Sequence, residues 1–334
     1  MIIQKIKKSI IYQRRERYKR VTKKRIILVS AIIISIIAYG VIAKIKFESN
    51  QEKIYTKAEV IDNAIETKDN IEEESIKDTE EAKALSLDNS GYLPLDKDSN
   101  ADDAITVFHT TEKLLKEEIK YPVRTDGKKV AYLTFDDGPS TTNTPKVLDT
   151  LKENGIKATF LIMGKNAELS EQSKEILRRT AREGHAIGNH TYSHDYNYLY
   201  PNRVIDVNNF MTDVDKCNQT LKGILGKDFS TRVIRFPGGY WSWEGRTNIR
   251  PVIDEQGYAI IDWNTLSEDA EGKPNKTAEE LTEITRRNLD SLGPNADSVI
   301  ILMHDTYGKE ETAKSVQPII NIFKEKGFEF RTIK

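Results

Sequence analysis

Cysteine is almost missing from this chain of 334 residues, because Cys217 is the only one. A single cysteine excludes an internal disulfide, so the fold must rely on its core and not on bridges. Cys217 lies in a helical pattern without a neighbouring catalytic or zinc-binding signature. This favours packing over a nucleophile or a zinc-thiolate site. The sequence also lacks internal repeats and low-complexity tracts.

The formal net charge of the chain is −1, and this near-neutral value hides two strongly charged regions. Residues 1–25 hold eleven Lys or Arg and one acid, Glu16, which is a net charge of +10. Residues 48–103 hold seventeen Asp or Glu and six Lys, which is a net charge of −11, and they are nearly free of glycine and proline. Charge runs of this kind are usually solvated, so we interpret the acidic region as a stalk.

An uncharged run, Ile26–Ala43, separates the two charged regions. As a helix this run would rise roughly 27 Å, close to a hydrocarbon thickness of about 30 Å. It is apolar on every face, which favours a membrane span over a buried core helix. Since Lys and Arg resist translocation, we expect a single-pass protein of the cell membrane, with the basic end in the cytoplasm and the rest extracytoplasmic. A cleaved signal peptide is the alternative, because Val41 and Ala43 are small, but the long basic lead favours a retained anchor.

These shifts in composition divide the chain into four regions. We predict a basic cytoplasmic segment at 1–25, a transmembrane anchor at 26–43, an acidic stalk at 44–126 and a folded domain at 127–334. Residues 105–121 have a better helical apolar pattern than the rest of the stalk. This part can therefore dock on the folded domain.

From Val130 onward, strand-like apolar runs alternate with helix-like segments, which is typical of a parallel sheet covered on both faces. Seven strands are predicted, at residues 130–135, 158–163, 186–188, 233–234, 258–261, 299–302 and 328–333. Seven such units close more readily into a distorted β/α barrel than into an open sheet. We therefore expect an α/β fold, a distorted (β/α)7 barrel, whose functional residues lie at the carboxyl ends of the strands.

Polar segments follow or end these strands, at residues 134–140, 190–194, 235–239, 262–263 and 302–304. Together they supply the ligands, base and acid that metal-assisted hydrolysis requires. The first segment contains Asp136 and Asp137 before Gly138-Pro139, which alone is ordinary turn chemistry. Adjacent acids on an extended backbone point in different directions, so one can bind a metal while the other faces a water molecule.

His190 and His194 are four residues apart and can converge on one cation if the segment turns helically. The chain has only five histidines, and we interpret His109 and His185 as structural. With one carboxylate from a neighbouring strand, the pair predicts a divalent metal site that leaves positions open for water and substrate. Zinc is the first expectation, and cobalt or manganese are acceptable because nitrogen and oxygen ligands discriminate weakly.

The remaining segments carry side chains that are ambiguous alone. Arg235 in isolation is a surface cation, and Trp263 after an apolar run is commonly a core residue. Beside Asp136, however, the charge of Arg235 would lower the pKa of that carboxyl. Opposite Leu302, Trp263 can wall a small apolar pocket of the size of a methyl group.

The order and wording of these segments, Thr134-Phe-Asp-Asp-Gly-Pro-Ser140, His190-Thr-Tyr-Ser-His194, Arg235-Phe-Pro-Gly-Gly239, Asp262-Trp263 and Leu302-Met-His304, resemble the polysaccharide deacetylases of carbohydrate esterase family 4. This NodB-homology group removes acetyl groups from acetylated sugars. The resemblance covers roughly residues 128–334 and implies the same irregular barrel. It further implies that Asp137 is a metal ligand, that Asp136 is the general base, and that Arg235 holds this base by a hydrogen bond.

The same resemblance implies that His304 is the general acid, with Asp262 accepting its other N–H. Asp305 is an alternative partner for His304. The family usually has Pro-Tyr-Gly where this chain has Pro237-Gly238-Gly239. The missing Tyr side chain changes the cleft wall, but the oxyanion contact resembles a backbone N–H, and Gly238 still has one.

The sequence therefore predicts a membrane-anchored, metal-dependent deacetylase that acts outside the cell. Its expected partner is an acetylated cell-wall polysaccharide, first the N-acetylglucosamine of peptidoglycan because that glycan is nearest, with poly-N-acetylglucosamine, chitin oligomers and xylan left open. No nucleic-acid partner is expected, and no protein partner is evident. Two other classes are a non-haem iron oxygenase, which shares two His and a carboxylate, and a silent glycan-binding module. The first has no need for the extra acids and Arg, and the second would usually show a broken motif.

Overall fold

The computed structural model describes residues 92–121 and 124–334. The predicted basic segment at 1–25, the predicted anchor at 26–43 and most of the predicted stalk at 44–126 lie outside these residues and stay predictions. Among the helices of the described part, none is both long and apolar enough to cross a membrane.

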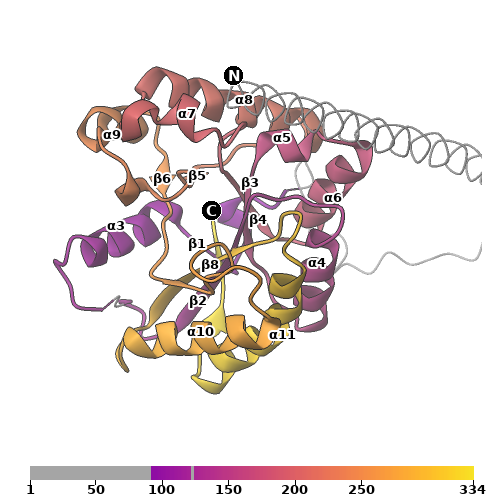
Figure 1. Cartoon of the computed structure of the whole chain (residues 1–334), viewed down its shortest axis with the longest axis vertical. Coiled ribbons are helices and arrows are strands. Elements are labelled where there is room, and N and C mark those ends of the chain that lie inside the picture. The colour runs from indigo at the N-terminus through magenta and orange to yellow at the C-terminus, as the bar shows by residue number, and fades with distance from the viewer. Residues whose placement is uncertain (1–91, 122–123) are drawn as a thin grey trace, which may run out of the picture. The chain divides into compact units, whose positions relative to one another are not determined.

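Parallel strands form the centre of the fold, and helices surround them (Figure 1). The main sheet runs in the order β6-β5-β4-β3-β2-β8-β7, and each of its pairings is parallel. The strands are β2 Val130–Asp136, β3 Thr159–Ile162, β4 Ala186–Asn189, β5 Val233–Ile234, β6 Ala259–Ile260, β7 Thr265–Leu266 and β8 Ser298–His304. A further strand, β9 Glu329–Phe330, pairs with the start of β2 beside this path.

The sheet does not close, which corrects the expected seven-stranded barrel to an α/β half-barrel. β6 and β7 stand at opposite ends of the strand order, and no pairing joins them within the described residues. The predicted strand at 328–333 also divides into β9 and β10 Thr332–Ile333, and β10 pairs with β1 Ala101–Asp102 in a separate sheet. The last strand of the main path is instead β7, whose two residues form no apolar run that a pattern could detect.

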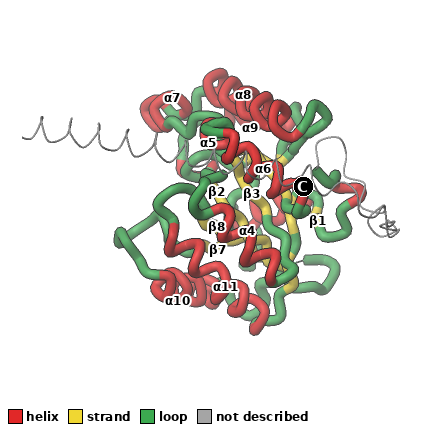
Figure 2. The backbone as a smooth tube through the Cα atoms, turned by 90° about the vertical axis from the view of Figure 1, so that its right-hand side faces the viewer, coloured by secondary structure: helices red, strands yellow, loops and turns green. Residues whose placement is uncertain are grey.

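Helices follow most strands and cover the outside of the half-barrel (Figure 2). They are α4 Thr144–Glu153, α5 Gly164–Ala167, α6 Glu171–Arg182, α7 Tyr196–Leu199, α8 Val207–Leu225, α9 Arg246–Glu255, α10 Ala278–Ser291 and α11 Glu310–Glu325, with 3-10 turns η1 Leu95–Lys97, η2 Pro201–Arg203 and η3 Tyr240–Ser242. Local chemistry explains where α10 begins, because the Thr277 hydroxyl accepts from the Glu280 N–H while the Glu280 carboxylate accepts from the Thr277 N–H.

The described residues before position 127, at 92–121 and 124–126, include a helix that packs on the folded unit. The helix α3 Ala104–Leu115 starts at Asp103, whose carboxylate accepts from the Thr106 N–H at 2.9 Å. Val107 and Phe108 are buried in the core cluster that also contains side chains of β5 and β6. Part of the segment with the helical apolar pattern at 105–121 therefore forms the helix α3, which packs on the folded domain.

Alternation along β2 decides which side chains reach the interior of the half-barrel. Leu133 and Phe135 join the core cluster that contains side chains of α4 and α11, whereas Tyr132 joins the cluster that contains β5 and β6. Because successive side chains of a strand point to opposite faces, Asp136 shares the inner face with Tyr132 and Thr134. The last residue of β2 thus presents its carboxylate to the interior, at the carboxyl end of the sheet.

Candidate active site and metal centre

Asp137, His190 and His194 meet at the carboxyl end of the sheet and form the candidate metal centre. One ligand atom from each lies within 4.8 Å of the other two. The Nε2 atoms of His190 and His194 are 3.5 and 3.4 Å from Asp137 Oδ1. That oxygen is buried and has no hydrogen-bond partner in the described part of the chain. A buried, unpaired carboxylate oxygen facing two imidazoles fits a divalent cation, so the predicted convergence of these three residues is confirmed.

The backbone conformation of this centre is unusual for the residues that form it. Asp137 and His194 have φ angles of 67° and 54°, and Thr191 between the histidines has 65°. Such left-handed conformations cost free energy in residues with a side chain and persist where surrounding contacts hold them. Asn166 Nδ2 donates to the Asp137 carbonyl at 2.7 Å, and the Asp213 carboxylate accepts from the backbone N–H groups that follow Thr191. Contacts from α5 and α8 therefore fix the turns that aim the ligands.

The tautomer of His190 follows from its hydrogen bond. Its Nδ1 lies 2.8 Å from the carbonyl oxygen of Arg235, and a carbonyl only accepts, so Nδ1 carries the proton. The lone pair of Nε2 is then directed toward Asp137. Burial lowers the pKa of His190 to about 3, against the opposing effect of the Asp137 charge. His190 is therefore neutral at physiological pH, as a metal ligand must be.

Asp136 lies beside the centre and pairs with Arg235. Arg235 Nη1 donates to Asp136 Oδ1 at 2.7 Å, and the other carboxylate oxygen is 3.6 Å from His190 Nε2. Burial raises the pKa of Asp136, while the charges of Arg235 and His304 oppose that rise. The predicted contact with Arg235 is confirmed, and the guanidinium lowers the pKa of Asp136 as expected, although burial outweighs this effect and the pKa is raised overall.

Arg235 is held from several sides and is fully buried. Its Nε donates to the Ile261 carbonyl at 2.6 Å, and Nη1 also donates to the Thr134 hydroxyl at 2.9 Å. The guanidinium lies 5.6 Å from the centre of the Trp263 ring. These contacts tie β5, β6 and β2 together and leave the guanidinium one orientation in which to hold Asp136.

His304 ends β8 and sits directly across from Asp136 in the register of the two strands. Its Nδ1 donates to Asp269 Oδ1 at 2.9 Å, and its backbone N–H donates to Asp269 Oδ2 at 2.8 Å. Burial opposes the charged imidazole, but the carboxylates of Asp269 and Asp136 raise the pKa of His304 to about 9. His304 is thus a cation at neutral pH, able to donate a proton from Nε2.

Asp262 does not bind His304, which corrects the expectation that it orients the general acid. Its carboxylate accepts from the Tyr240 N–H at 3.2 Å, and burial raises its pKa to about 6. The alternative partner, Asp305, is also engaged elsewhere, because its Oδ2 accepts from the Thr144 hydroxyl at 2.5 Å. Asp262 and Asp305 both follow strand ends, as predicted, but their carboxylates accept hydrogen bonds from Tyr240 and Thr144 and not from His304.

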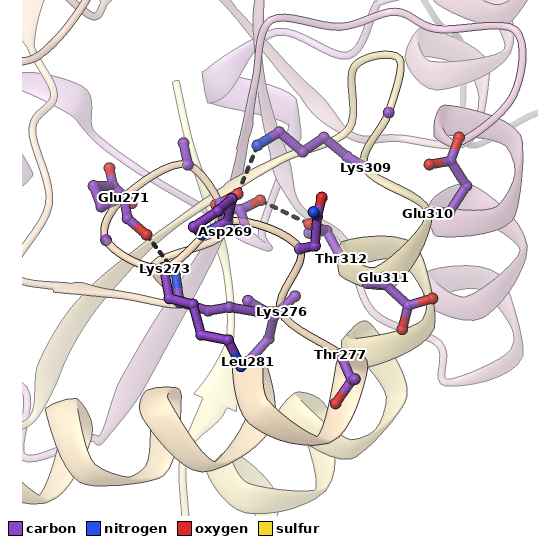
Figure 3. Close-up of a pocket in the computed structure, with 15 residues that line it drawn as sticks. Asp269, Glu271, Lys273, Lys276, Thr277, Leu281, Lys309, Glu310, Glu311 and Thr312 are labelled. Carbon is purple, nitrogen blue, oxygen red and sulfur yellow. Dashed lines mark hydrogen bonds between the residues drawn. The ribbon is translucent and has the colours of Figure 1, made fainter.

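Asp269, the actual partner of His304, was missed in the sequence. It lies three residues beyond β7, in a loop without any motif. Thr312 Oγ1 donates to its carboxylate at 2.8 Å, and Lys309 Nζ donates to its carbonyl at 2.6 Å (Figure 3). The loop and the start of α11 line an open cavity of about 640 Å³, and Asp269 and Lys309 are among its lining residues (Figure 3). Only the detection of β7 would have directed attention to this loop.

Gly238, Trp263 and Leu302 are the predicted substrate contacts. Gly238 follows β5 and Trp263 follows β6, as expected, whereas Leu302 lies inside β8, which continues to His304. Gly238 is exposed, with φ 75°, and no described backbone or side-chain acceptor takes its N–H. Trp263 is half-buried, and Leu302 is buried on β8. That Trp263 and Leu302 form an acetyl pocket stays a prediction.

The two histidines interpreted as structural lie outside this constellation. His185 is buried, and its Nδ1 accepts from the Ala158 N–H at 3.1 Å. His109 is on α3 with a mostly exposed side chain. Neither belongs to the group of possible ligands among the described residues.

A family model described as polysaccharide deacetylase matches residues 123–260. A peptidoglycan-N-acetylglucosamine deacetylase of Bacillus cereus is 34% identical over 204 residues, which are 60% of this chain and 66% of that protein. A chitin deacetylase of Colletotrichum lindemuthianum is 34% identical over 205 residues, which are 60% of this chain and 76% of that protein. This chain thus spans about two thirds of the length of the Bacillus relative.

The fold resembles that of solved structures. A CE4 esterase of Streptococcus mutans aligns with a TM-score of 0.61 and 34% sequence identity, and the match covers 70% of this chain and 92% of that chain. The half-barrel described above is therefore shared with a solved relative.

Proposed function

This chain belongs to the polysaccharide deacetylase family, carbohydrate esterase family 4, and from that premise we propose that it hydrolyses N-acetyl groups of a cell-wall glycan. The observation that carries the proposal is a pair of neighbouring ion pairs, of which one member each, Asp136 and His304, ends one of two adjacent strands. Asp136 with Arg235 and His304 with Asp269 lie across from each other at the ends of β2 and β8, beside the metal centre. One pair offers a base and the other an acid, which is the combination that amide hydrolysis requires.

Asp136 is the proposed general base. Its free oxygen faces the metal centre, 3.6 Å from His190 Nε2, while Arg235 occupies the other oxygen. Arg235 acts as a positioning residue, because it fixes the carboxylate and favours its charged form. A cation held by Asp137, His190 and His194 would supply Lewis-acid chemistry, by polarising the acetyl carbonyl and lowering the pKa of water. Asp136 then takes the proton of the attacking water molecule.

His304 is the proposed general acid. Its high pKa keeps Nε2 protonated, so this atom can protonate the departing amine nitrogen. Asp269 holds the other nitrogen of the ring and thereby fixes its direction. The unpaired N–H of Gly238 is the proposed donor to the developing oxyanion. The half-buried Trp263 and the buried Leu302 are the proposed walls of the acetyl-methyl site.

Peptidoglycan N-acetylglucosamine is the proposed substrate. Two features support it: the peptidoglycan deacetylase of Bacillus cereus among the relatives, and the apolar run at 26–43, which would hold the domain outside the cell membrane. The chitin deacetylase among the relatives supports chitin oligomers as the other candidate. Zinc is the proposed metal, since two imidazoles and a carboxylate suit it, and cobalt or manganese suit the same set.

The test is an incubation of the purified full-length chain with peptidoglycan and, separately, with acetylated chitooligosaccharide. The products are weighed by mass spectrometry for loss of acetyl groups. We expect deacetylation of N-acetylglucosamine in peptidoglycan. Loss confined to the chitooligosaccharide would contradict the substrate, and no loss from either polymer would contradict the proposed function.

A further inference from the structure

The place of the usual family tyrosine is filled here from another part of the chain. At Gly238, where the family pattern has Tyr, an added Cβ would lie 3.1 Å from the hydroxyl oxygen of Tyr196 and 3.1 Å from Trp243. The φ angle of 75° also disfavours any residue with a side chain. Position 238 therefore supplies a backbone N–H, and Tyr196 provides the polar side-chain atom beside that point of the rim.

Tyr196 is held firmly although it is partly exposed. It is the first residue of α7, and the preceding residue, Asp195, caps this helix because its carboxylate accepts from the Asn197 N–H at 2.9 Å. Its ring centre is 5.2 Å from the ring of His194 and 5.2 Å from that of Trp243, with the second pair edge to face. Trp243 is itself fixed, since its Nε1 donates to the Pro237 carbonyl at 2.8 Å. The tyrosine ring is thus packed between a proposed metal ligand and the segment that carries Gly238.

The hydroxyl of Tyr196, unlike its ring, is not held by contacts with the described residues. The side chain belongs to a residue that is 44% exposed, and no described residue forms a hydrogen bond with this hydroxyl. A phenol that is held by its ring and has a free O–H can donate to a ligand at little entropic cost. The hydroxyl oxygen lies 3.1 Å from the point where a Cβ on Gly238 would stand, and the ring contacts that of His194, one of the proposed metal ligands.

We propose that Tyr196 is a second oxyanion donor, whose hydroxyl hydrogen-bonds the acetyl carbonyl oxygen together with the N–H of Gly238. This inference rests on the proposed deacetylase function. Two donors aimed at one oxygen stabilise the charge that develops when water attacks the carbonyl. Because the second donor comes from α7 and not from position 238, the chain compensates for the missing Tyr with a residue on a different element.

The test compares Tyr196→Phe with Tyr198→Phe in the full-length chain. Tyr198 is on the same short helix and is 39% exposed, which makes it a matched control. Tyr196→Phe removes only the hydroxyl, and we expect kcat to fall by at least about 10-fold with little change in KM, since a transition-state contact is lost. Metal content by mass spectrometry and the melting temperature should match those of the wild type. Tyr198→Phe should retain wild-type kcat.

Three results would overturn the proposal. One is a wild-type kcat for Tyr196→Phe, and another is an equal fall for Tyr198→Phe. The third is a fall in kcat that accompanies loss of metal, because Tyr196 would then support His194 and not the substrate. Failure of the inference is distinguishable from failure of the proposed function, since in the second case the wild-type chain itself would release no acetate.

Discussion

His304 donates to both oxygens of the Asp269 carboxylate, through ring Nδ1 at 2.9 Å and through its backbone N–H at 2.8 Å. This double contact fixes the ring relative to its own main chain and places a negative charge behind it. Burial of Asp269 would raise its pKa, but the charge of His304 and their hydrogen bond lower it. The two groups therefore stabilise each other as an ion pair over a broad range of pH.

The first prediction concerns the pH dependence of activity. In the wild type, the pKa of about 9 at His304 keeps the general acid protonated below that pH, so kcat should fall only as pH rises through this value. Asp269→Asn removes the carboxylate that raises this pKa, so the alkaline limb should move to lower pH. Asp262→Asn is the control and should leave the alkaline limb in place. A limb that moves with Asp262→Asn and not with Asp269→Asn would restore Asp262 as the partner of the acid.

The second prediction concerns the metal ligands. Substitution of Asp137, His190 or His194 by Ala removes one of the three converging ligand atoms, so bound metal and turnover should fall together. His109→Ala, on the outer face of α3, is the control and should retain both. Metal content is measured by mass spectrometry after dialysis, and turnover by acetate release. Chelation should abolish turnover, and added zinc or cobalt should restore it; full turnover of metal-stripped protein contradicts the site.

The third prediction concerns stability and the extent of the folded unit. Phe108 on α3 is 5% exposed and packs in the cluster that contains β5 and β6. Phe108→Ala should lower the free energy of unfolding by about 3–5 kcal/mol, because it leaves a cavity in that core. Urea denaturation measures the loss, with His109→Ala as a neighbour that should change stability little. A loss below about 1 kcal/mol would mean that α3 is not integral to the domain.

The sequence predicted those strands that consist of long apolar runs, and it also predicted the site residues at the ends of these strands. β2, β3 and β8 are continuous and buried, so the polar residues at their ends, such as Asp136 and His304, could be placed on one rim. His190 and His194 were identified because their spacing and a nearby acid suit a metal. The pairing of Arg235 with Asp136 followed from the family resemblance, and the structure confirms the contact.

Other features depend on contacts that no local pattern encodes. β7 is defined by pairing with β8 and not by its own two residues, so both the open edge and the loop that carries Asp269 were missed. Asp262 occupies the expected position after a strand, but its carboxylate accepts a hydrogen bond from the Tyr240 N–H and not from His304. The effect of Arg235 on the pKa of Asp136 was predicted, but the larger opposing effect of burial was not, because the degree of burial follows from the tertiary fold.

The most direct measurement compares Asp136→Asn with Asp137→Asn, determining bound metal and acetate release on the same protein samples. Asp136→Asn preserves the shape of the side chain and all three proposed ligands, but an amide cannot accept a proton from water. We predict that this variant retains wild-type metal content while turnover falls by roughly 10²-fold or more. Asp137→Asn should lose metal and turnover together. If Asp136→Asn empties the metal site instead, or if Asp137→Asn keeps its metal and only slows turnover, the assignment of base and ligand is wrong.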